Sequence, residues 1–180
     1  MSKFSLSNSK KKVLLHICCA PCSACAVKML RGDYDIFFYW YNPNIYDRLE
    51  YKNRKDSAVN YAKELDIPFY EEKDFFYNYN NWKNNSLEQC SLCYTLRLEK
   101  TTVFAKQNNF DFFSTSLLSS PYQKHDLVKQ IARDLADKHK INFLYCDFRP
   151  GFYENKNLLR QKGYYMQKYC ACNKSKNGKI

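Results

Sequence analysis

Short apolar runs alternate along the chain with longer segments in which the apolar residues are widely spaced. The runs predict buried strands at residues 13–17, 34–41, 68–70, 110–114 and 142–145. The segments between them predict helices at residues 23–31, 46–66, 91–107 and 121–140, and a short helix from the turn at 147–151 to about residue 162. Strands that alternate with helices indicate a mostly parallel sheet with helices on both faces. The pattern therefore predicts an α/β fold with a five-stranded, Rossmann-like sheet.

The length of 180 residues and the apolar content of 45% suit a single domain with one core. We expect that domain to span residues 1–180. Residues 1–12, which are rich in Ser and Lys, and residues 174–180 are expected to be mobile tails, the second of them beyond a cysteine-rich segment. Residues 74–86 are aromatic and rich in Asn, and their pattern assigns them to no element.

Polar residues and cysteines follow four of the five predicted strands. Parallel α/β sheets bind their ligands beyond the carboxyl ends of the strands, so side chains in these turns are expected to share a site. They are Cys18, Cys19 and Cys22 after the first strand, Asn42 and Asn44 after the second, residues 114–116 after the fourth, and Asp147 and Arg149 after the fifth.

Nine cysteines are many for a chain of this length. Seven of them form three clusters: Cys18, Cys19 and Cys22; Cys90 and Cys93; Cys170 and Cys172. The first twelve residues lack the apolar run of a secretory signal, and no run approaches the ~18 apolar residues that cross a membrane. We therefore expect a cytoplasmic protein, in which clustered cysteines indicate metal or redox chemistry rather than disulfides. The two remaining cysteines, Cys25 and Cys146, are interpreted as small core residues.

Thiolates select zinc or iron–sulfur clusters among the common metals. Cys19 and Cys22, like Cys90 and Cys93, have the C-x-x-C spacing that presents two sulfurs to one centre. Seven thiolates exceed the four that a structural zinc or a simple cluster needs, which favours an iron–sulfur cluster beside a second metal or redox group. Two alternatives stay open: a structural zinc with spare buried cysteines, and thiol–disulfide exchange at the sequence Cys-Ala-Pro-Cys of residues 19–22.

The net charge of +11, from 29 Lys and Arg against 18 Asp and Glu, suits a polyanionic partner such as nucleic acid. A general compositional bias is the alternative, because Asn, Lys and Tyr are all abundant. Tyrosines such as Tyr122 are able to stack on unpaired bases. The four glycines form no phosphate-binding loop after a strand, so use of ATP or NAD is not expected.

Several longer motifs together resemble one family. They are LLHICCAPCS at residues 14–23, YNPNI at 41–45, CSLCY at 90–94, FSTSLLSSPYQ at 113–123, DFRPG at 147–151 and YYMQKYCAC at 164–172. They follow one another over about residues 13–173, and with them the chain resembles the QueH family of epoxyqueuosine reductases. The resemblance implies an α/β fold like that of the adenine-nucleotide hydrolases, with the nucleotide site given over to metal.

The resemblance also implies an activity, the last step of queuosine synthesis. Two electrons and two protons remove the epoxide oxygen of epoxyqueuosine as water, at the wobble position of tRNA and without cobalamin. The implied cofactors are a [4Fe-4S] cluster and an adjacent mononuclear iron. The implied partners are tRNAs with GUN anticodons and an electron donor that the sequence does not identify.

Site residues follow from the resemblance by position. The implied cofactor-binding cysteines are Cys18, Cys19, Cys90, Cys93, Cys170 and Cys172, and the metal ligands further include Cys22 and Asp147. We predict that Cys18, Cys19 and Asp147 are catalytic and that Ser114, Tyr122, His125 and Arg149 contact the substrate. Ala171 stands where the family has a glycine, which leaves the two flanking ligands in place. A zinc-stapled RNA-binding module without catalysis remains the alternative function.

Overall fold

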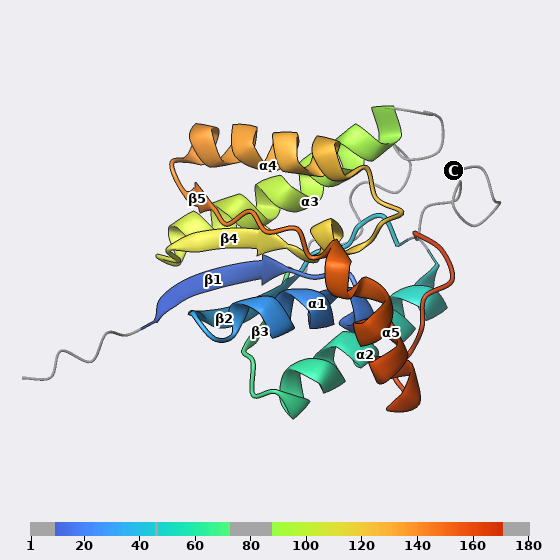
Figure 1. Cartoon of the computed structure of the whole chain (residues 1–180). Coiled ribbons are helices and arrows are strands. Elements are labelled where there is room, and N and C mark those ends of the chain that lie inside the picture. Colours follow the sequence, from blue (N-terminus) through green and yellow to red (C-terminus); the bar gives the residue numbers. More distant parts are fainter. Residues whose placement is uncertain (1–9, 46, 73–87, 171–180) are drawn as a thin grey trace, which may run out of the picture.

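The computed structural model describes residues 10–45, 47–72 and 88–170 (Figure 1). Its centre is a five-stranded sheet in the order β3-β2-β1-β4-β5, in which every pair of neighbours is parallel. The strands are β1 Lys11–His16, β2 Tyr34–Trp40, β3 Phe69–Glu71, β4 Phe112–Thr115 and β5 Asn142–Phe143. The predicted fold class, an α/β fold with a five-stranded parallel sheet, is confirmed.

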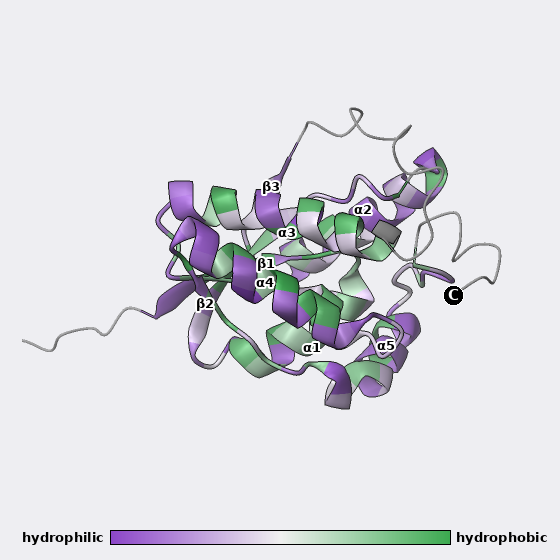
Figure 2. Cartoon of the chain, turned by 90° about the horizontal axis from the view of Figure 1, so that it is seen from above, coloured by the Kyte–Doolittle hydropathy of each residue, from purple (hydrophilic) through white to green (hydrophobic). Residues whose placement is uncertain are grey.

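Within the described residues, five α-helices and two short 3-10 helices connect the strands or follow the last of them. They are α1 Ala20–Leu30, α2 Arg48–Glu64, α3 Glu88–Gln107, η2 Ser116–Ser119, α4 His125–His139, η3 Arg149–Gly151 and α5 Phe152–Gln161. Helices α3 and α4 cover one face of the sheet, and α1, α2 and α5 cover the other (Figure 1). In the view from above, the helices carry hydrophilic and hydrophobic stripes, as expected where one side packs on a sheet and the other meets water (Figure 2).

The core forms around β1, which lies between β2 and β4. Val13, Leu14 and Leu15 are completely buried, because a central parallel strand with helices on both faces has no side in contact with water. This explains why β1 and β2 appear in the sequence as nearly continuous apolar runs. Phe38 on β2 and Phe113 on β4 are likewise completely buried.

Several element boundaries differ from those that the sequence predicts, and the start of α4 differs most. The helix expected from Pro121 begins at His125, because residues 120–123 form a turn in which the Gln123 amide donates to the Ser120 carbonyl at 3.2 Å. Residues 115–120, which lie between the strand predicted at 110–114 and the helix predicted at 121–140, contain η2, whose first turn is capped by the Thr115 hydroxyl. Residues 74–86, which the sequence did not assign, lie outside the described residues.

The strand order places a switch point at the carboxyl ends of β1 and β4. From β1, the chain continues outward through β2 and β3, whereas β4 and β5 lie on its other side. The connections that leave β1 and β4 therefore diverge, and a crevice opens between them. The loop after β1 and η2 meet there, since the Cys18 amide donates to the Ser116 hydroxyl oxygen at 3.3 Å.

Candidate metal centre and substrate cavity

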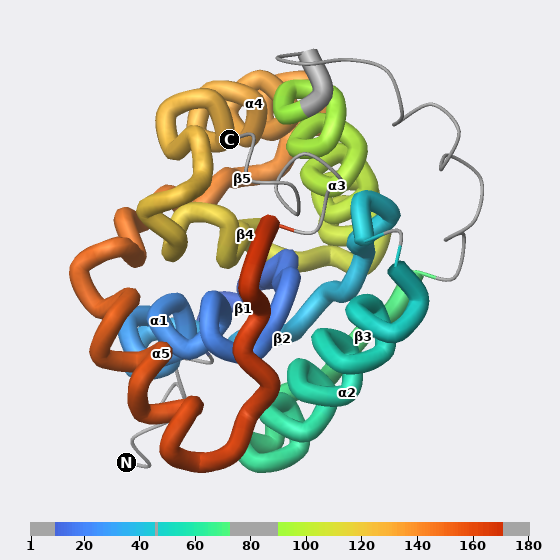
Figure 3. The backbone as a smooth tube through the Cα atoms, turned by 90° about the vertical axis from the view of Figure 1, so that its right-hand side faces the viewer, coloured from blue at the N-terminus to red at the C-terminus, as the bar shows by residue number. Residues whose placement is uncertain are grey.

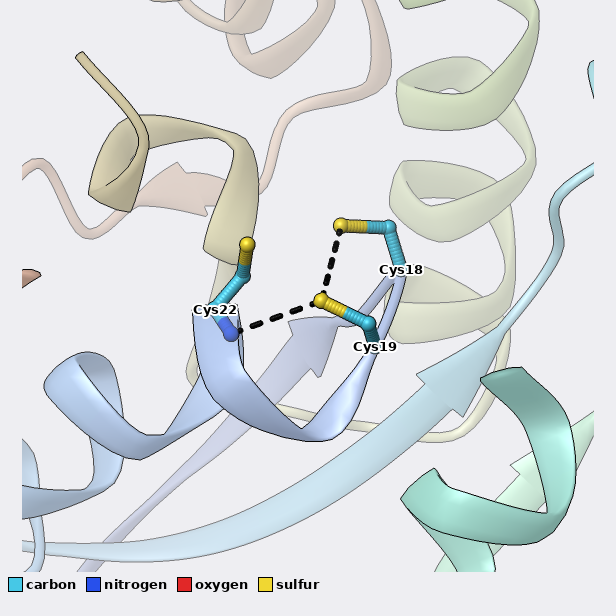
Figure 4. Close-up of side chains that lie close together, drawn as sticks. All are labelled: Cys18, Cys19 and Cys22. Atoms are coloured by element: carbon cyan, nitrogen blue, oxygen red, sulfur yellow. Dashed lines mark hydrogen bonds between the residues drawn. The ribbon is translucent and has the colours of Figure 1, made fainter. Parts of the chain in front are cut away.

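Three cysteines converge at this switch point (Figure 4). The sulfurs of Cys18, Cys19 and Cys22 all lie within 4.8 Å of one another, and those of Cys18 and Cys19 are 4.0 Å apart. All three are buried and none forms a disulfide. Two sulfurs on one tetrahedral metal at a bond length of about 2.3 Å would be about 3.8 Å apart. The observed spacing therefore suits a shared metal.

The local backbone explains this convergence. Cys19 is the N-cap of α1, with φ −176° and ψ 163°, and its sulfur accepts from the Cys22 amide. Pro21 lies in the first turn of α1, where its missing N–H costs no hydrogen bond. The Ser23 hydroxyl donates to the Cys19 carbonyl at 2.9 Å. A cap that is itself a cysteine thus directs two sulfurs of the C-x-x-C pair to the same side.

The three thiols share their protons unequally. Hydrogen bonds with the side chains of Cys19 and Cys22 hold the pKa of Cys18 well below its usual range, against the effect of burial. The pKa of Cys19 is raised, mainly by burial, and that of Cys22 is raised, mainly by its interaction with Cys18. Of the three thiols, that of Cys18 therefore loses its proton most readily. Binding a metal through all three sulfurs as thiolates would release the protons that remain on them.

Cysteines from the middle and end of the chain approach the same place. Cys93, on α3, is 9% exposed and accepts from Arg97 at 3.7 Å. Cys170 accepts from the Gln123 side-chain amide at 3.2 Å and lines one small cavity together with Cys18, Cys22 and Arg97. Figure 3 shows the C-terminal segment crossing in front of the carboxyl end of β1.

The predicted cysteines therefore differ in how closely they approach one another. Among the described residues, Cys18, Cys19 and Cys22 form the tight group, and Cys93 and Cys170 lie outside it around the same arginine. Cys90 is half-buried in the first turn of α3. Cys172 lies outside the described residues. The liganding roles of all seven cysteines remain predictions.

Arg97 is a residue of the site that the sequence analysis missed. The residue is 1% exposed, and its guanidinium donates to the Asn42 side-chain oxygen at 2.8 Å. Its Nε lies 3.4 Å from Nε2 of His16, a completely buried histidine that contacts the Thr115 hydroxyl. Burial and the Arg97 charge lower the pKa of His16 to about 3, so this histidine is neutral. The sequence does contain one signal for Arg97: it follows Cys93 by four residues on a predicted helix, so the two side chains lie on the same face of that helix.

A larger cavity of about 540 Å³ adjoins the cysteines. Cys22, Ser120, Gln123, Gln167 and Cys170 line both this cavity and the small one beside Arg97. The rest of its lining is mainly aromatic, basic and apolar: Pro21, Tyr122, Phe152, Lys156, Met166, Lys168 and Tyr169. The cavity thus has sulfur and amide groups at its base and aromatic rings and lysines around it.

The other predicted site residues are placed in different ways. Tyr122, 69% exposed, lines the large cavity, and its hydroxyl lies 3.2 Å from that of Tyr153. Ser114 donates to the Leu144 carbonyl at 2.9 Å, a contact that ties β4 to the chain after β5. Nε2 of His125 lies 3.2 Å from the Tyr145 hydroxyl.

Asp147 is held by Arg149. The guanidinium donates to both carboxylate oxygens, at 2.8 and 2.6 Å, and these hydrogen bonds lower the pKa of Asp147 to about 2. Ser114, His125, Asp147 and Arg149 line neither of the two cavities. Their predicted catalytic, liganding and substrate-binding roles stay predictions.

The family model described as "Epoxyqueuosine reductase QueH" matches residues 13–178. The chain belongs to the QueH family. Membership makes it an oxidoreductase, and the epoxyqueuosine reductase name of the family places it in queuosine biosynthesis. The resemblance read from the sequence motifs is confirmed.

Curated QueH proteins match most of the chain. An epoxyqueuosine reductase QueH from Dehalococcoides mccartyi is 31% identical over 167 residues, which cover 89% of this chain and 90% of that protein. The QueH of Acinetobacter baylyi is 32% identical, over 94% of this chain and 83% of that protein. The QueH of Thermotoga maritima is 28% identical, over 89% of this chain and 88% of that protein.

A solved structure shares the fold. The U34-tRNA thiolase NcsA from Methanococcus maripaludis, solved with its [4Fe-4S] cluster, matches with a TM-score of 0.50 and 13% sequence identity. The match covers 93% of this chain and 78% of that one. Among the helices within the described residues, none is both long and apolar enough to span a membrane.

Proposed function

We propose that this chain reduces epoxyqueuosine to queuosine at the wobble position of tRNA, without cobalamin. The balanced change is an epoxide plus two electrons and two protons, giving an alkene and water. The observation that carries the proposal is that Cys22, from the tight group of three cysteines, and Cys170, from the other end of the chain, line both the 540 Å³ cavity and the small cavity beside Arg97. We further propose that these cysteines bind a [4Fe-4S] cluster and an adjacent iron.

The residues present fit such a group in their chemistry. The donors of the tight group are sulfurs, which select zinc and iron–sulfur centres. They are free cysteines within 4.8 Å of one another rather than a disulfide. Arg97 adds a second argument, because a buried guanidinium beside cysteines favours their thiolate form.

Under this proposal, the metal ligands are Cys18, Cys19, Cys22, Cys90, Cys93, Cys170, Cys172 and Asp147. When bound, such a centre supplies the two electrons and a Lewis acid for the epoxide oxygen. The surrounding residues orient the cysteines. Gln123 donates to Cys170 and accepts from the Tyr94 hydroxyl at 2.7 Å, so its amide is held from both ends.

The large cavity suits a modified nucleoside removed from its base stack. Tyr122 and Tyr169 offer aromatic faces to a base, and Lys156 and Lys168 offer charge to phosphate. The side chain of Gln167 is a further argument that a ligand binds in this cavity. Its Nε2 faces the Cys22 sulfur at 3.9 Å, while its buried Oε1 has no hydrogen-bond partner within the described part of the chain. A hydroxyl or ammonium group of the substrate would satisfy that oxygen.

The proposed substrate is tRNA with a GUN anticodon, which agrees with the net charge of +11. The activity needs an electron donor, and dithionite serves as a chemical substitute in a test. The cytoplasm, where tRNA is modified, is the compartment that the proposal implies.

The test is an anaerobic assay of iron-reconstituted protein with dithionite and tRNA that contains epoxyqueuosine. Mass analysis of the nucleosides should show queuosine. Cys22→Ser should abolish the product, whereas Cys25→Ser, a change of the same kind outside the cluster, should retain it. Protein that contains iron and sulfide but gives no queuosine would refute the activity.

A zinc-stapled RNA-binding module is the second candidate, because a sulfur spacing of 4.0 Å fits zinc as well as iron. It predicts colourless protein with one zinc per chain. It also predicts that tRNA binding continues at any reductant concentration without a change in the nucleoside. Iron, sulfide and zinc analysis of the anaerobically purified protein separates the two candidates.

A further inference from the structure

Arg97 carries a positive charge in the interior of the molecule. The side chain is 1% exposed and starts one helical turn after Cys93, so both face the carboxyl end of the sheet from α3. Its Nη2 donates to Oδ1 of Asn42 at 2.8 Å, and its Nη1 to the Cys93 sulfur at 3.7 Å. Nε lies 3.4 Å from Nε2 of His16. All three ends of the guanidinium are therefore engaged.

None of these partners is a carboxylate. Asn42 is an amide and His16 an imidazole, and neither kind of group offers a negative charge. Among the ion pairs found in the described ranges, none involves Arg97. A buried guanidinium without a counter-ion carries a large desolvation cost. The groups beside it that are able to carry negative charge are the sulfur of Cys93, at 3.7 Å, and those of Cys18 and Cys170, which line the same small cavity as Arg97.

The surroundings hold this guanidinium firmly in place. The Asn42 side chain accepts from Arg97 and also donates to the Ile17 carbonyl at 2.9 Å, directly before Cys18. His16 is fixed by the Thr115 hydroxyl at 3.0 Å. The arginine is thus tied to the loop after β1 as well as to α3. Such a rigid arrangement is typical of a group that orients or tunes a metal centre.

We propose that Arg97 is a positioning residue that supplies the counter-charge of the metal–thiolate centre and orients Cys93. The inference rests on the proposed function. A fixed positive charge and a hydrogen bond to a ligand sulfur both stabilise the more electron-rich state of an iron–sulfur centre. Arg97 therefore raises the reduction potential, which makes the centre easier to reduce before it reduces the substrate.

The experiment compares Arg97→Met with Arg97→Lys. The two replacements have similar length, but only lysine retains the positive charge. Arg133→Met is the control, since Arg133 is exposed on α4. Each protein is reconstituted anaerobically, its iron and sulfide are counted, and its midpoint potential is measured by a redox titration followed by electron paramagnetic resonance. Circular dichroism shows whether each variant is folded.

We expect Arg97→Met to shift the midpoint to a more negative value, or to bind less iron while it remains folded. Arg97→Lys should lie closer to the unchanged protein, and Arg133→Met should equal it. An Arg97→Met protein with full iron and an unchanged midpoint would overturn the inference. Equal loss of iron in both Arg97 variants would overturn the counter-charge role, because lysine keeps the charge. If the protein without any substitution binds no iron–sulfur cluster, the metal part of the proposed function is refuted, and the inference with it.

Discussion

At the scale of single residues, the site depends on polar groups that lie behind or beside the cysteines. The sequence identifies the sulfurs because C-x-x-C pairs stand out in a chain without other metal motifs. It does not identify Arg97 or Gln123, which belong to a chain with 29 Lys and Arg and many amides. Their importance comes from burial and from contacts across long sequence separations, such as Gln123 with Cys170. Spacing alone does not contain that information.

The metal-free protein should show a thiolate at Cys18 at neutral pH. Because hydrogen bonds with the Cys19 and Cys22 side chains lower the pKa of Cys18, its alkylation rate should change little between about pH 8 and about pH 7. The pKa of Cys146 is raised by burial and by Asp147, so its rate should fall roughly tenfold over that interval. Peptide mass spectrometry after iodoacetamide treatment measures both. An equally steep fall at Cys18 would contradict the shared-proton arrangement.

Replacement of Gln167 tests whether its unpaired Oε1 accepts a hydrogen bond from the substrate. Gln167→Leu should lower kcat/KM for tRNA roughly fivefold, since it removes one hydrogen bond of about 1 kcal/mol to the substrate. Iron content should stay unchanged, because the contact of Gln167 with Cys22 is long, at 3.9 Å. Gln130→Leu is the control on the exposed side of α4 and should have no effect. An unchanged kcat/KM in Gln167→Leu would show that this oxygen does not meet the substrate.

At the scale of elements, α2 holds the segment that brings Cys170 to the site. Arg54 and Glu50 form an almost fully buried pair at 2.6 Å on this helix. Arg54 also donates to the Tyr169 carbonyl at 2.7 Å, and Glu50 accepts from the Tyr165 hydroxyl. Breaking such a pair would leave a buried charge. The pair thus fixes a segment without regular secondary structure through charged groups rather than through a sheet.

Tyr165→Phe should loosen this segment. Loss of a hydrogen bond to a charged group, worth about 1.5–3 kcal/mol, should speed hydrogen exchange in residues 163–170 by roughly 10- to 100-fold. Tyr70→Phe is the control on β3, where the ring packs against Phe37 and Phe104. Exchange followed by mass spectrometry measures the effect peptide by peptide. Unchanged exchange would mean that the segment is held by other contacts.

The strands, α4 and α2 show which parts of the fold can be predicted from the sequence. The strands could be predicted because a parallel sheet covered on both faces needs continuous apolar runs, as in residues 34–41. The start of α4 was placed four residues early at Pro121, since proline suits a first helical turn as well as a turn before a helix. The sequence does not predict that α2 holds the C-terminal segment. In the sequence, Glu50 and Arg54 have the pattern of ordinary surface charges, and they are buried only because the C-terminal segment covers them.

At the scale of the whole molecule, the order of the strands brings together cysteines that are far apart in the sequence. Residues 18–22, 93 and 170 are separated by long stretches, but the order β3-β2-β1-β4-β5 leads their elements to one edge of the sheet. The cavity opens at this edge, and Lys156 and Lys168 line it. Part of the positive charge of the chain, whose net charge is +11, therefore lies at the cavity.

Binding of tRNA should weaken steeply with salt, and the cavity lysines should contribute to the slope. Each phosphate contact adds about 0.7–0.9 to the slope of log K against log salt concentration. Lys156→Gln and Lys168→Gln should each lower the slope by roughly that amount. Lys138→Gln should leave it unchanged, because Lys138 pairs with Glu99 near the end of α4, at the amino end of the sheet. Fluorescence anisotropy with labelled anticodon stem-loop at several salt concentrations gives the slopes. Equal slopes in all three variants would place the tRNA on another face of the molecule.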